Sequence, residues 1–517
     1  MPKSSPFLFN FVGRSESSTK NFLIAWLSLI ALYRILVTAQ QHMGLFFDEA
    51  YYFHWAQLLD WGYYSKPPMV AWCIAVTTQL FGATDVSVKL ASPILYSLSA
   101  WVVFLIGRKL DDERTGLIAA LIFSTAPIVG FNSLFITTDA PLFFFWALAM
   151  YVALLCLEQN KMWQWLLLGF CLGCGMLSKY TYAAVVLGFL AYLLWTRRFD
   201  VFRNLGFYVA TGLSLLIAST NLLWNWQHDF IAFTHTKEIA KLDEDLVKPI
   251  ALLSFLLTQA FVIGVFWVVY ALIKRKQWSQ RIPNADAVKF LVSCMSPILV
   301  VIGTQAFLSR AFPNWAGAFV IPASVLLAFV VKYASNRTIY LGLASNLVLL
   351  SLFYHWPNVL SLSGVAETKK NSPYFRLSGW QEAALQGEDT IAGMKEAIAP
   401  VAVMSNSRDL LAYVGFYNRI HANDLYYWNS NTENIRNHYD LKNNARDLIS
   451  QSETSAGKAG NILFLRKDEM PGAIQDSFEY VKLEQFVDYQ VSPSIKRHYY
   501  IYSVQGFKGY PDDNEKN

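Results

Sequence analysis

Long apolar runs separated by short polar stretches dominate the first two-thirds of the chain. A run of about 20 apolar residues is long enough to cross the ~30 Å hydrocarbon core of a bilayer as an α-helix. The pattern therefore predicts a membrane all-α multi-helix bundle with about eleven transmembrane helices. We expect them at roughly 21–40, 86–107, 115–132, 140–157, 163–178, 181–196, 204–224, 250–273, 287–307, 313–332 and 338–356.

The pattern changes near residue 366, where "ETKKNSPYFRLSGWQEAALQGEDT" is polar and rich in turn residues. Beyond it, "VAVMSN" and "NILFLRK" are typical of buried strands, "RDLLAYVGFY" of a helix between them, and "RHYYIYSV" of a late strand. We therefore expect two domains. Residues 1–360 form a polytopic transmembrane domain with outer-surface amphipathic helices in 46–82, and residues 366–517 form a small soluble α/β domain.

Basic residues in the short connections predict the orientation, because cytoplasmic loops retain Lys and Arg. They fall on alternate connections, and the N-terminal segment shares their side. The basic residues of that side are Lys3, Arg14, Lys20, Arg108, Lys109, Arg114, Lys161, Arg197, Arg198, Arg203, Lys274, Arg275, Lys276, Arg281, Lys332 and Arg337. The N-terminus is thus predicted to be cytoplasmic. Residues 41–85, 133–139, 225–249, 308–312 and everything after about 357 are predicted to lie outside.

Composition supports a membrane protein. Of 517 residues, 54% are hydrophobic and 15% charged, against about 25% charged in soluble proteins. The formal net charge of +5 falls mostly on the cytoplasmic loops, so it argues for membrane orientation and against nucleic-acid binding. The first apolar segment is too long for a cleaved signal peptide and is expected to remain as an anchor. All five cysteines lie in apolar segments, so no disulfide framework or zinc site is predicted.

The first outer loop holds the most unusual charges, in "FFDEAYYFHWAQLLDWGYYSKPPMVAW". Asp48 and Glu49 open a predicted amphipathic helix on the membrane surface, with aromatic residues such as Tyr51 and Tyr52. The structural alternative is that Asp48 only caps this helix. Two prolines hold Lys66 in an extended segment, where it either binds the phosphate of a lipid-linked substrate or snorkels to membrane phosphate.

Three later outer loops add candidates. Asp139 precedes Ala-Pro at an expected helix start, so it is either an N-cap or a second carboxylate of a site. His235 and Lys237 are plausible phosphate contacts, with solvated side chains as the alternative. Arg310 lies at the outer mouth of a helix, where snorkelling and phosphate contact both fit.

These motifs, taken in order, resemble those of a known family. The matching pieces are "DEAYYFHWA" with "GYYSKPPMVAW", "TTDAPLFFFWALAMY", "LSKYT", "NWQHDFIAF", "PNWAGA" and "LSGW". The sequence resembles the bacterial polytopic GT-C glycosyltransferases that are related to protein O-mannosyltransferases and to the lipid A aminoarabinose transferase. The resemblance implies a polyprenyl-phosphate sugar donor, an outward-facing active site and inversion at the anomeric carbon.

Residue roles follow from the resemblance. Asp48 matches the first-loop catalytic aspartate, which acts as general base in relatives with hydroxyl acceptors, and Glu49 completes the acidic pair. Asp139 matches the acidic residue of the second outer loop. The residues expected at the donor phosphate are Lys66, His235, Lys237 and Arg310, and those expected at the substrate are Tyr51, Tyr52, Tyr63, Asn314 and Trp315.

The sequence also departs from these relatives. Tyr51 stands where the aminoarabinose branch has an arginine, and Lys66 where many bacterial relatives have a histidine. Phosphate binding is therefore expected to be shared among Lys66, His235 and Arg310. No cofactor is predicted, since Walker-type and dinucleotide fingerprints are absent from the sequence. Metal independence is expected, with Mg²⁺ or Mn²⁺ at the carboxylates as the alternative.

The favoured interpretation is an inverting glycosyltransferase of the inner membrane, with its active site and C-terminal domain in the periplasm. It would act on an envelope glycolipid, such as lipid A or its core, or on another exported glycan. A protein O-mannosyltransferase-like enzyme is the first alternative, a transporter or lipid flippase the second, and a scaffold the last. The C-terminal domain shows no catalytic constellation, and Trp380 in it is predicted to be a packing residue.

Overall fold

The computed structural model describes residues 16–40, 43–240, 247–282, 284–397, 402–431, 434–446 and 462–510. The chain forms two compact units. The first comprises Met1–Val37, Lys66–Cys73 and Lys89–Tyr354, and the second comprises Thr38–Ser65, Ile74–Val88 and His355–Asn517. The sequence-based division assigned the whole first outer loop to the transmembrane domain, whereas here most of that loop belongs with the C-terminal region.

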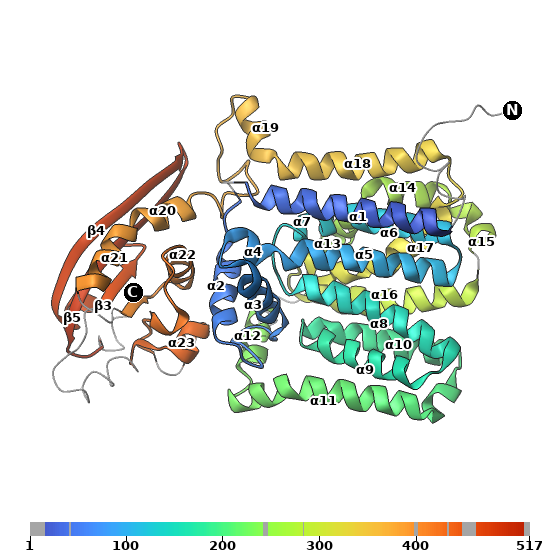
Figure 1. Ribbon diagram of the computed structural model, residues 1–517, viewed down its shortest axis with the longest axis horizontal. Helices are drawn as coiled ribbons and strands as arrows, with labels where there is room; N and C mark the ends of the chain where they lie inside the picture. The colour runs from blue at the N-terminus through green and yellow to red at the C-terminus, as the bar shows by residue number, and fades with distance from the viewer. Residues whose placement is uncertain are drawn as a thin grey trace. The chain divides into compact units, whose positions relative to one another are not determined.

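The first unit is a bundle of helices (Figure 1). Its described helices are α1 (Glu16–Thr38), α5 (Ala91–Leu110), α6 (Glu113–Thr125), α7 (Pro127–Asn132), α8 (Asp139–Gln159), α9 (Met162–Met176), η1 (Tyr180–Tyr182), α10 (Ala183–Trp195), η2 (Phe199–Arg203), α11 (Leu205–Gln227), α12 (Ile231–Ala240), α13 (Pro249–Ile263), α14 (Val265–Ile273), η3 (Arg275–Gln277), α15 (Trp278–Arg281), α16 (Ala285–Leu308), η4 (Pro313–Phe319), α17 (Val320–Val331) and α18 (Asn336–Tyr354).

Helices occupy all eleven predicted segments, but the predicted count of membrane spans is not confirmed. Among the described residues, seven helices are long and apolar enough to cross a membrane. An eighth span results if α13 and α14, which are bent by 99°, are taken together. The break falls at Gly264, whose φ of 115° is a conformation that glycine adopts readily. The helices α6, α9 and α10 have 13, 15 and 13 residues, fewer than the ~20 that a span needs.

Close packing between helices depends on small residues, as the hairpin of α5 and α6 illustrates. A Cβ atom added to Gly116 would lie 2.5 Å from the carbonyl oxygen of Phe104, and one added to Gly107 would lie 2.8 Å from the Cα of Gly116. Two glycines therefore allow the two backbones to touch. Such contacts matter inside a bilayer, where lipid is as apolar as the side chains and association relies on close van der Waals packing.

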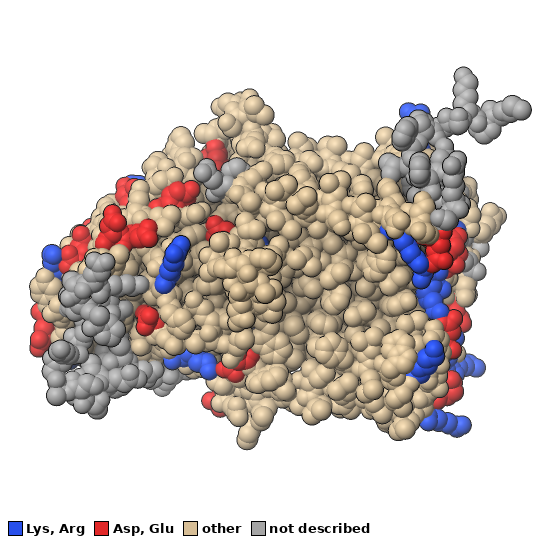
Figure 2. All heavy atoms as spheres, in the orientation of Figure 1, with Lys and Arg blue, Asp and Glu red and all other residues tan. Residues whose placement is uncertain are grey.

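Charged residues gather at one end of the helical unit on the face shown in Figure 2, while its flank is free of them. Arg108 pairs with Glu16 at 2.8 Å, and Lys109 of the same helix pairs with Glu158 near the end of α8. Since α8 has 21 residues and rises ~1.5 Å per residue, Asp139 at its start lies roughly 30 Å from this charged end. The basic connections and the candidate residue Asp139 therefore lie at opposite ends of α8.

Arg34 is buried inside the helical unit. Its Nη2 donates to the carbonyl oxygen of Ser124 at 2.6 Å and its Nε to the hydroxyl of Tyr354 at 3.3 Å. Tyr354 in turn donates to the carbonyl oxygen of Gly130 at 2.8 Å. This arginine therefore joins α1, α6 and α18 by hydrogen bonds, as buried charged groups in a membrane protein require.

The second unit combines a mixed sheet with helices. Its elements are α2 (Phe47–Gln57), most of α3 (Met69–Phe81), α4 (Asp85–Lys89) up to Val88, α19 (Trp356–Leu362), α20 (Trp380–Gln386), α21 (Glu388–Ala397), β1 (Ala402–Ser405), α22 (Arg408–Tyr417), η5 (Ala422–Asp424), β2 (Leu425–Tyr427), α23 (His438–Lys442), β3 (Ile462–Arg466), α25 (Gly472–Gln475), β4 (Phe478–Ser492) and β5 (Ile495–Phe507). The strand order is β2-β1-β3-β5-β4, with β1 parallel to β2 and β3, and β5 antiparallel to β3 and β4.

The small α/β domain predicted from sequence is confirmed. The predicted strands correspond to β1, β3 and β5, and the predicted helix to α22. All five residues of β3 are buried, because both faces of the sheet are covered. The helices α20 and α22 cover one face (Figure 1). An apolar cluster that includes Trp428 and Phe464 fills the other. Burial on both faces explains why these strands are continuously apolar. Trp380 stacks on Tyr413 at 4.9 Å, as expected of a packing residue.

Candidate functional site

The acidic pair divides into one buried and one accessible carboxylate. Glu49 is 1% exposed, and its Oε2 accepts a hydrogen bond from the backbone N–H of Phe46 at 2.8 Å. It therefore satisfies a free N–H at the start of α2, the capping role considered for Asp48. The side chain of Asp48 is 34% exposed, so this carboxylate is the one that a substrate can reach. A catalytic role for Glu49, predicted from the resemblance, does not fit its burial.

Arg408 lies against Asp48, although the two are far apart in the sequence. Its Nη2 is 3.4 Å from Oδ1 of Asp48. Its guanidinium carbon lies 5.1 Å from the ring centre of Phe47 and 5.0 Å from that of Tyr51, within the range of cation–π attraction. The resemblance implies an arginine at the position of Tyr51 in the aminoarabinose branch, and the structure places the guanidinium of Arg408 over the Tyr51 ring. Arg408 was not predicted as a site residue, because nothing in the local pattern links it to the first outer loop.

The helix α2 is buried. The prediction that it is an amphipathic helix on the membrane surface is therefore wrong. Residues Glu49 through Ala56 are all buried. Within the second unit, α2 packs against α22, and Phe53 meets Phe416 edge-to-face at 4.9 Å (Figure 1). The ring stack of Trp55 on Tyr63, at 4.6 Å, covers another side. Aromatic residues that the sequence assigned to a membrane interface therefore pack against protein.

Three tyrosines predicted to contact substrate are buried, and two of them hold α2 in place. Tyr63 is fully buried, and its hydroxyl donates to the carbonyl oxygen of Trp55 at 3.0 Å. Tyr51 is 1% exposed and accepts a hydrogen bond from the backbone N–H of His438. Burial raises the pKa of both phenols, so neither is an acid or base near neutral pH. Tyr52, 6% exposed, is also inside the protein.

His54 completes the attachment of α2 to α23. Its Nδ1 lies 2.6 Å from the hydroxyl of Tyr439, and both side chains are buried. Burial, with a smaller effect of nearby His421, lowers the pKa of His54 to about 3. The imidazole is therefore neutral at physiological pH and does not supply a titrating group next to Asp48.

In the first unit, Asp139 forms a buried ion pair. Its Oδ1 lies 2.6 Å from Nζ of Lys179, and the side chains are 4% and 16% exposed. Asn314 donates to Oδ2 at 3.4 Å. The predicted N-cap role for Asp139 is wrong, because α8 begins at this residue and its N–H donates to Oγ1 of Thr137. Residues from three separate segments thus meet at one carboxylate. Its cation, Lys179, belongs to the "LSKYT" motif, in which no residue was assigned a role from the sequence.

Lys66 belongs to the same unit as Asp139. The Pro-Pro segment after it leads into α3, whose first residue, Met69, donates a backbone hydrogen bond to Leu177 at 3.1 Å. Lys66 lies three residues before this contact and Lys179 two residues after it. The contact therefore brings the segments that carry the two lysines side by side. Lys66 is half-buried.

The remaining cations cluster around α12. Nη2 of Arg310 donates to the backbone oxygen of Ile239 at 3.4 Å, near the carboxyl end of α12, where a positive charge is favourable. His235 lies about one helical turn before Ile239, and its Nδ1 is 3.8 Å from Oε2 of Glu238. Lys237 and Arg310 are exposed, as is Asn314, whereas Trp315 is half-buried and packs on Phe312 at 5.3 Å.

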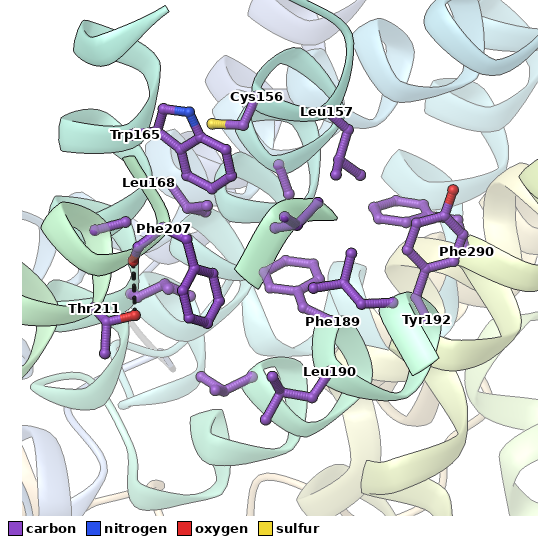
Figure 3. A pocket seen from close by; sticks show the side chains of 16 residues that line it. Cys156, Leu157, Trp165, Leu168, Phe189, Leu190, Tyr192, Phe207, Thr211 and Phe290 are labelled. Carbon is purple, nitrogen blue, oxygen red and sulfur yellow. Dashed lines mark hydrogen bonds between the residues drawn. The ribbon is translucent and has the colours of Figure 1, made fainter. Parts of the chain in front are cut away.

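An apolar cavity of about 190 Å³ lies among α8, α9, α10, α11 and α16 of the helical unit (Figure 3). Figure 3 shows Trp165, Phe189, Phe207 and Phe290 around it. A second cavity of about 230 Å³ in the other unit is lined by Phe53, Gln57 and Thr78 among others. Neither is lined by a predicted site residue. Within the described part of the chain, no group of three His, Cys, Asp or Glu side chains is placed to hold a metal ion.

The sequence is similar to those of known proteins. Residues 65–224 match a family described as dolichyl-phosphate-mannose-protein mannosyltransferase. Over 331 residues the chain is 30% identical to the lipid A galacturonosyltransferase RgtD of Rhizobium johnstonii. This match covers 62% of this chain and 68% of that protein. It is 33% identical over 144 residues to the undecaprenyl phosphate-alpha-4-amino-4-deoxy-L-arabinose arabinosyl transferase of Pseudomonas aeruginosa, a match covering 26% of each chain.

The fold is also similar to a solved structure. The crystal structure of ArnT from Cupriavidus metallidurans bound to undecaprenyl phosphate superposes with a TM-score of 0.63. The match covers 94% of this chain and 98% of that one, at 14% sequence identity. At this identity the likeness establishes the fold and not the substrate.

Proposed function

This chain belongs to the GT-C family of glycosyltransferases, and from that premise we propose that it moves a sugar from a polyprenyl-phosphate donor onto lipid A or its core. The observation that carries the proposal is the similarity to the lipid A galacturonosyltransferase, which extends over 68% of that protein. The shorter match to an enzyme named for an undecaprenyl-phosphate sugar supports the same class of donor.

Asp48 is the proposed general base. Its carboxylate takes the proton of an acceptor hydroxyl while that oxygen bonds to the anomeric carbon. The bond from the anomeric carbon to the phosphate oxygen breaks, and polyprenyl phosphate leaves with the electron pair, which inverts the anomeric configuration. The accessibility of Asp48, in contrast to buried Glu49, supports this choice.

Cations of the helical unit are the proposed partners of the donor phosphate. Lys66, His235, Lys237 and Arg310 would stabilise the charge that develops on the leaving phosphate. The exposure of Lys237 and Arg310 supports the assignment. Asn314 and Trp315 remain the proposed sugar contacts. Since fixed cations suffice to bind the phosphate, transfer is expected to survive thorough chelation of metal ions.

Asp139 has a different proposed role from that of Asp48. An acid that is 4% exposed and paired with Lys179 at 2.6 Å is poorly accessible to an acceptor hydroxyl. It would instead hold Lys179 and Asn314 in position at the mouth of the helical unit. This positioning role replaces the expectation that Asp139 is the second catalytic carboxylate of the site.

The proposed orientation places the N-terminus in the cytoplasm and residues 41–85, 133–139, 225–249 and 308–312 in the periplasm. The gathering of Arg108, Lys109 and Lys332 at one end of the helical unit supports it, because cytoplasmic ends retain basic residues. The region after residue 357 would then be periplasmic too.

The test is transfer by the purified full chain in lipid nanodiscs. Labelled polyprenyl-phosphate galacturonic acid, aminoarabinose and mannose are each offered with lipid A, core-bearing lipid A or an exported peptide. We expect one donor to label lipid A or its core, and Asp48→Asn to lose this activity. The matched control is Asp60→Asn, which removes another acid of the same loop, paired with Lys442 at 3.0 Å.

Each other outcome is informative. Labelling of the peptide alone would favour the protein O-mannosyltransferase-like alternative, which the family match over residues 65–224 supports. If no donor reacts but labelled donor crosses the bilayer of proteoliposomes, the protein is a flippase. Full activity of a folded Asp48→Asn variant would refute the assignment of the base.

A further inference from the structure

We propose that Arg408, in the C-terminal region of the chain, is a positioning residue for Asp48 in sugar transfer. The inference rests on the proposed function and adds to it a contribution from the soluble region, where the sequence shows no catalytic constellation. Arg408 would act through Asp48, without touching the sugar or the phosphate.

The guanidinium makes an ion pair and two ring contacts with the first turns of α2. It lies 3.4 Å from the Asp48 carboxylate and about 5 Å from the ring centres of Phe47 and Tyr51. The two rings restrict where the cation can lie, and the carboxylate meets it at one oxygen, Oδ1. A planar guanidinium suits this environment, because it stacks on rings while keeping its charge and its fork of N–H donors.

The position of Arg408 is set by a buried helix. It is the first residue of α22, and the residues from Leu410 through Phe416 are buried. The helix α2 packs against α22. It is also bound to α23 through Tyr51 and His54. Arg408 and Asp48 are thus presented to each other by two packed helices of one unit, as a preorganised pair requires.

The neighbouring charges leave Arg408 to act on Asp48. Asp409, the next residue of α22, is paired with Lys467, which with a hydrogen bond from Ser407 keeps the pKa of Asp409 low despite its burial. Among the described residues, Tyr51 on α2 and Tyr413 on α22 interact electrostatically with Asp48. Those that interact with Arg408 besides Asp48, Tyr51 and Asp409 are Tyr52 on α2, Tyr427 on β2 and Tyr439 on α23. A cation within about 4 Å favours the ionised carboxylate, the form that a base needs.

The proposal is tested by the kinetics of Arg408→Ala and Arg408→Lys, measured with the donor and acceptor that the transfer assay identifies. We expect Arg408→Ala to lower kcat roughly 100-fold with both KM values within about threefold of wild type, and the acidic limb of the pH profile to move upward. Added guanidinium ion should restore part of the activity of Arg408→Ala but none of Asp48→Asn. Lys442→Ala, which breaks the similar pair with Asp60, is the matched control and should keep wild-type rates.

A second measurement does not depend on activity. A water-soluble carbodiimide labels protonated carboxyl groups, and mass spectrometry of peptides reports the pH at which Asp48 is half labelled. We expect this midpoint to rise by about one pH unit or more in Arg408→Ala and to stay unchanged in Lys442→Ala. Arg408→Lys serves both assays if the alanine variant does not fold.

Two results would overturn the role of Arg408 while leaving sugar transfer intact. One is a higher KM with unchanged kcat, which would mean that Arg408 binds a substrate. The other is a folded variant with wild-type rates and labelling. Absence of transfer by the wild type with every donor would instead refute the proposed function itself.

Discussion

Lys179 and Asp139 form an ion pair inside the helical unit, with 2.6 Å between Nζ and Oδ1 and most of both side chains buried. Forty residues and the whole of α9 separate the two. In such an environment an unpaired charge is costly, whereas a matched pair is tolerated. The pair therefore fixes the mouth of the unit where α8 begins.

Breaking this pair from either side should destabilise the protein. We expect Lys179→Met and Asp139→Asn each to cost about 3 kcal/mol, because each leaves the partner buried without its counterion. The double variant should recover most of that loss. Thermal unfolding in detergent measures the stability of the two single variants and the double variant. If the two losses of stability simply add in the double variant, the two side chains do not depend on each other.

The acidic pair should separate into a stability residue and an activity residue. Glu49→Ala removes the acceptor of the Phe46 N–H and is expected to lower stability by about 1–2 kcal/mol, with activity per folded molecule retained. Asp48→Asn should keep the melting temperature and lose transfer at least ~100-fold. Inactivation by Glu49→Ala without loss of stability would contradict this division.

His54 should make stability depend on pH. Burial lowers its pKa to about 3, below its value of ~6.5 in an unfolded chain, so only the unfolded chain gains this proton as the pH falls. The contribution of neutral His54 to the free energy of unfolding is complete above about pH 6.5. Below that pH it declines by up to ~1.4 kcal/mol per pH unit. The melting temperature of wild type should fall more steeply between pH 6.5 and 5 than that of His54→Gln. Equal slopes would refute the assignment.

The contact of α5 with α6 should not tolerate a methyl group. Gly116→Ala would place a Cβ 2.5 Å from a backbone oxygen, and we expect a loss of about 1–3 kcal/mol from overpacking. Gly212→Ala, in the middle of α11, meets no atom within 4 Å and should stabilise slightly, by about 0.5–1 kcal/mol. Thermal melts of the two variants give the comparison, and equal effects would argue against the close approach.

Sequence analysis predicted the features that depend on local pattern. Apolar run length located a helix in each of the eleven predicted segments, although α12, in a predicted outer loop, was missed. The continuous apolar stretches around Met404 and Phe464 located two strands buried on both faces. The number of spans was harder, because Gly264 and Pro127 interrupt helices without interrupting the apolar pattern. Strand β4 was missed, since it forms an edge of the sheet and much of it is exposed.

The features that sequence analysis missed depend on contacts between distant segments. The aromatic residues of α2 carry the same composition whether they face lipid headgroups or another helix, so Tyr51 and Tyr63 were assigned to the wrong surroundings. Arg408 has no local signal, as its relation to Asp48 exists only in the folded unit. Glu49 could have been recognised, because a glutamate at the third position of a helix commonly caps it.

The attachment of α2 to α23 has a consequence for synthesis of the chain. His54 and Tyr439 are 385 residues apart, which at 5–20 residues per second is roughly 20 to 80 seconds of translation. For most of that time, until α22 and then α23 are made, the aromatic side chains of α2 lack their C-terminal partners and are open to chaperones or to wrong association. A nascent chain stalled before residue 438 should therefore be sensitive to protease at residues 47–57, and resistance should appear once α23 has emerged.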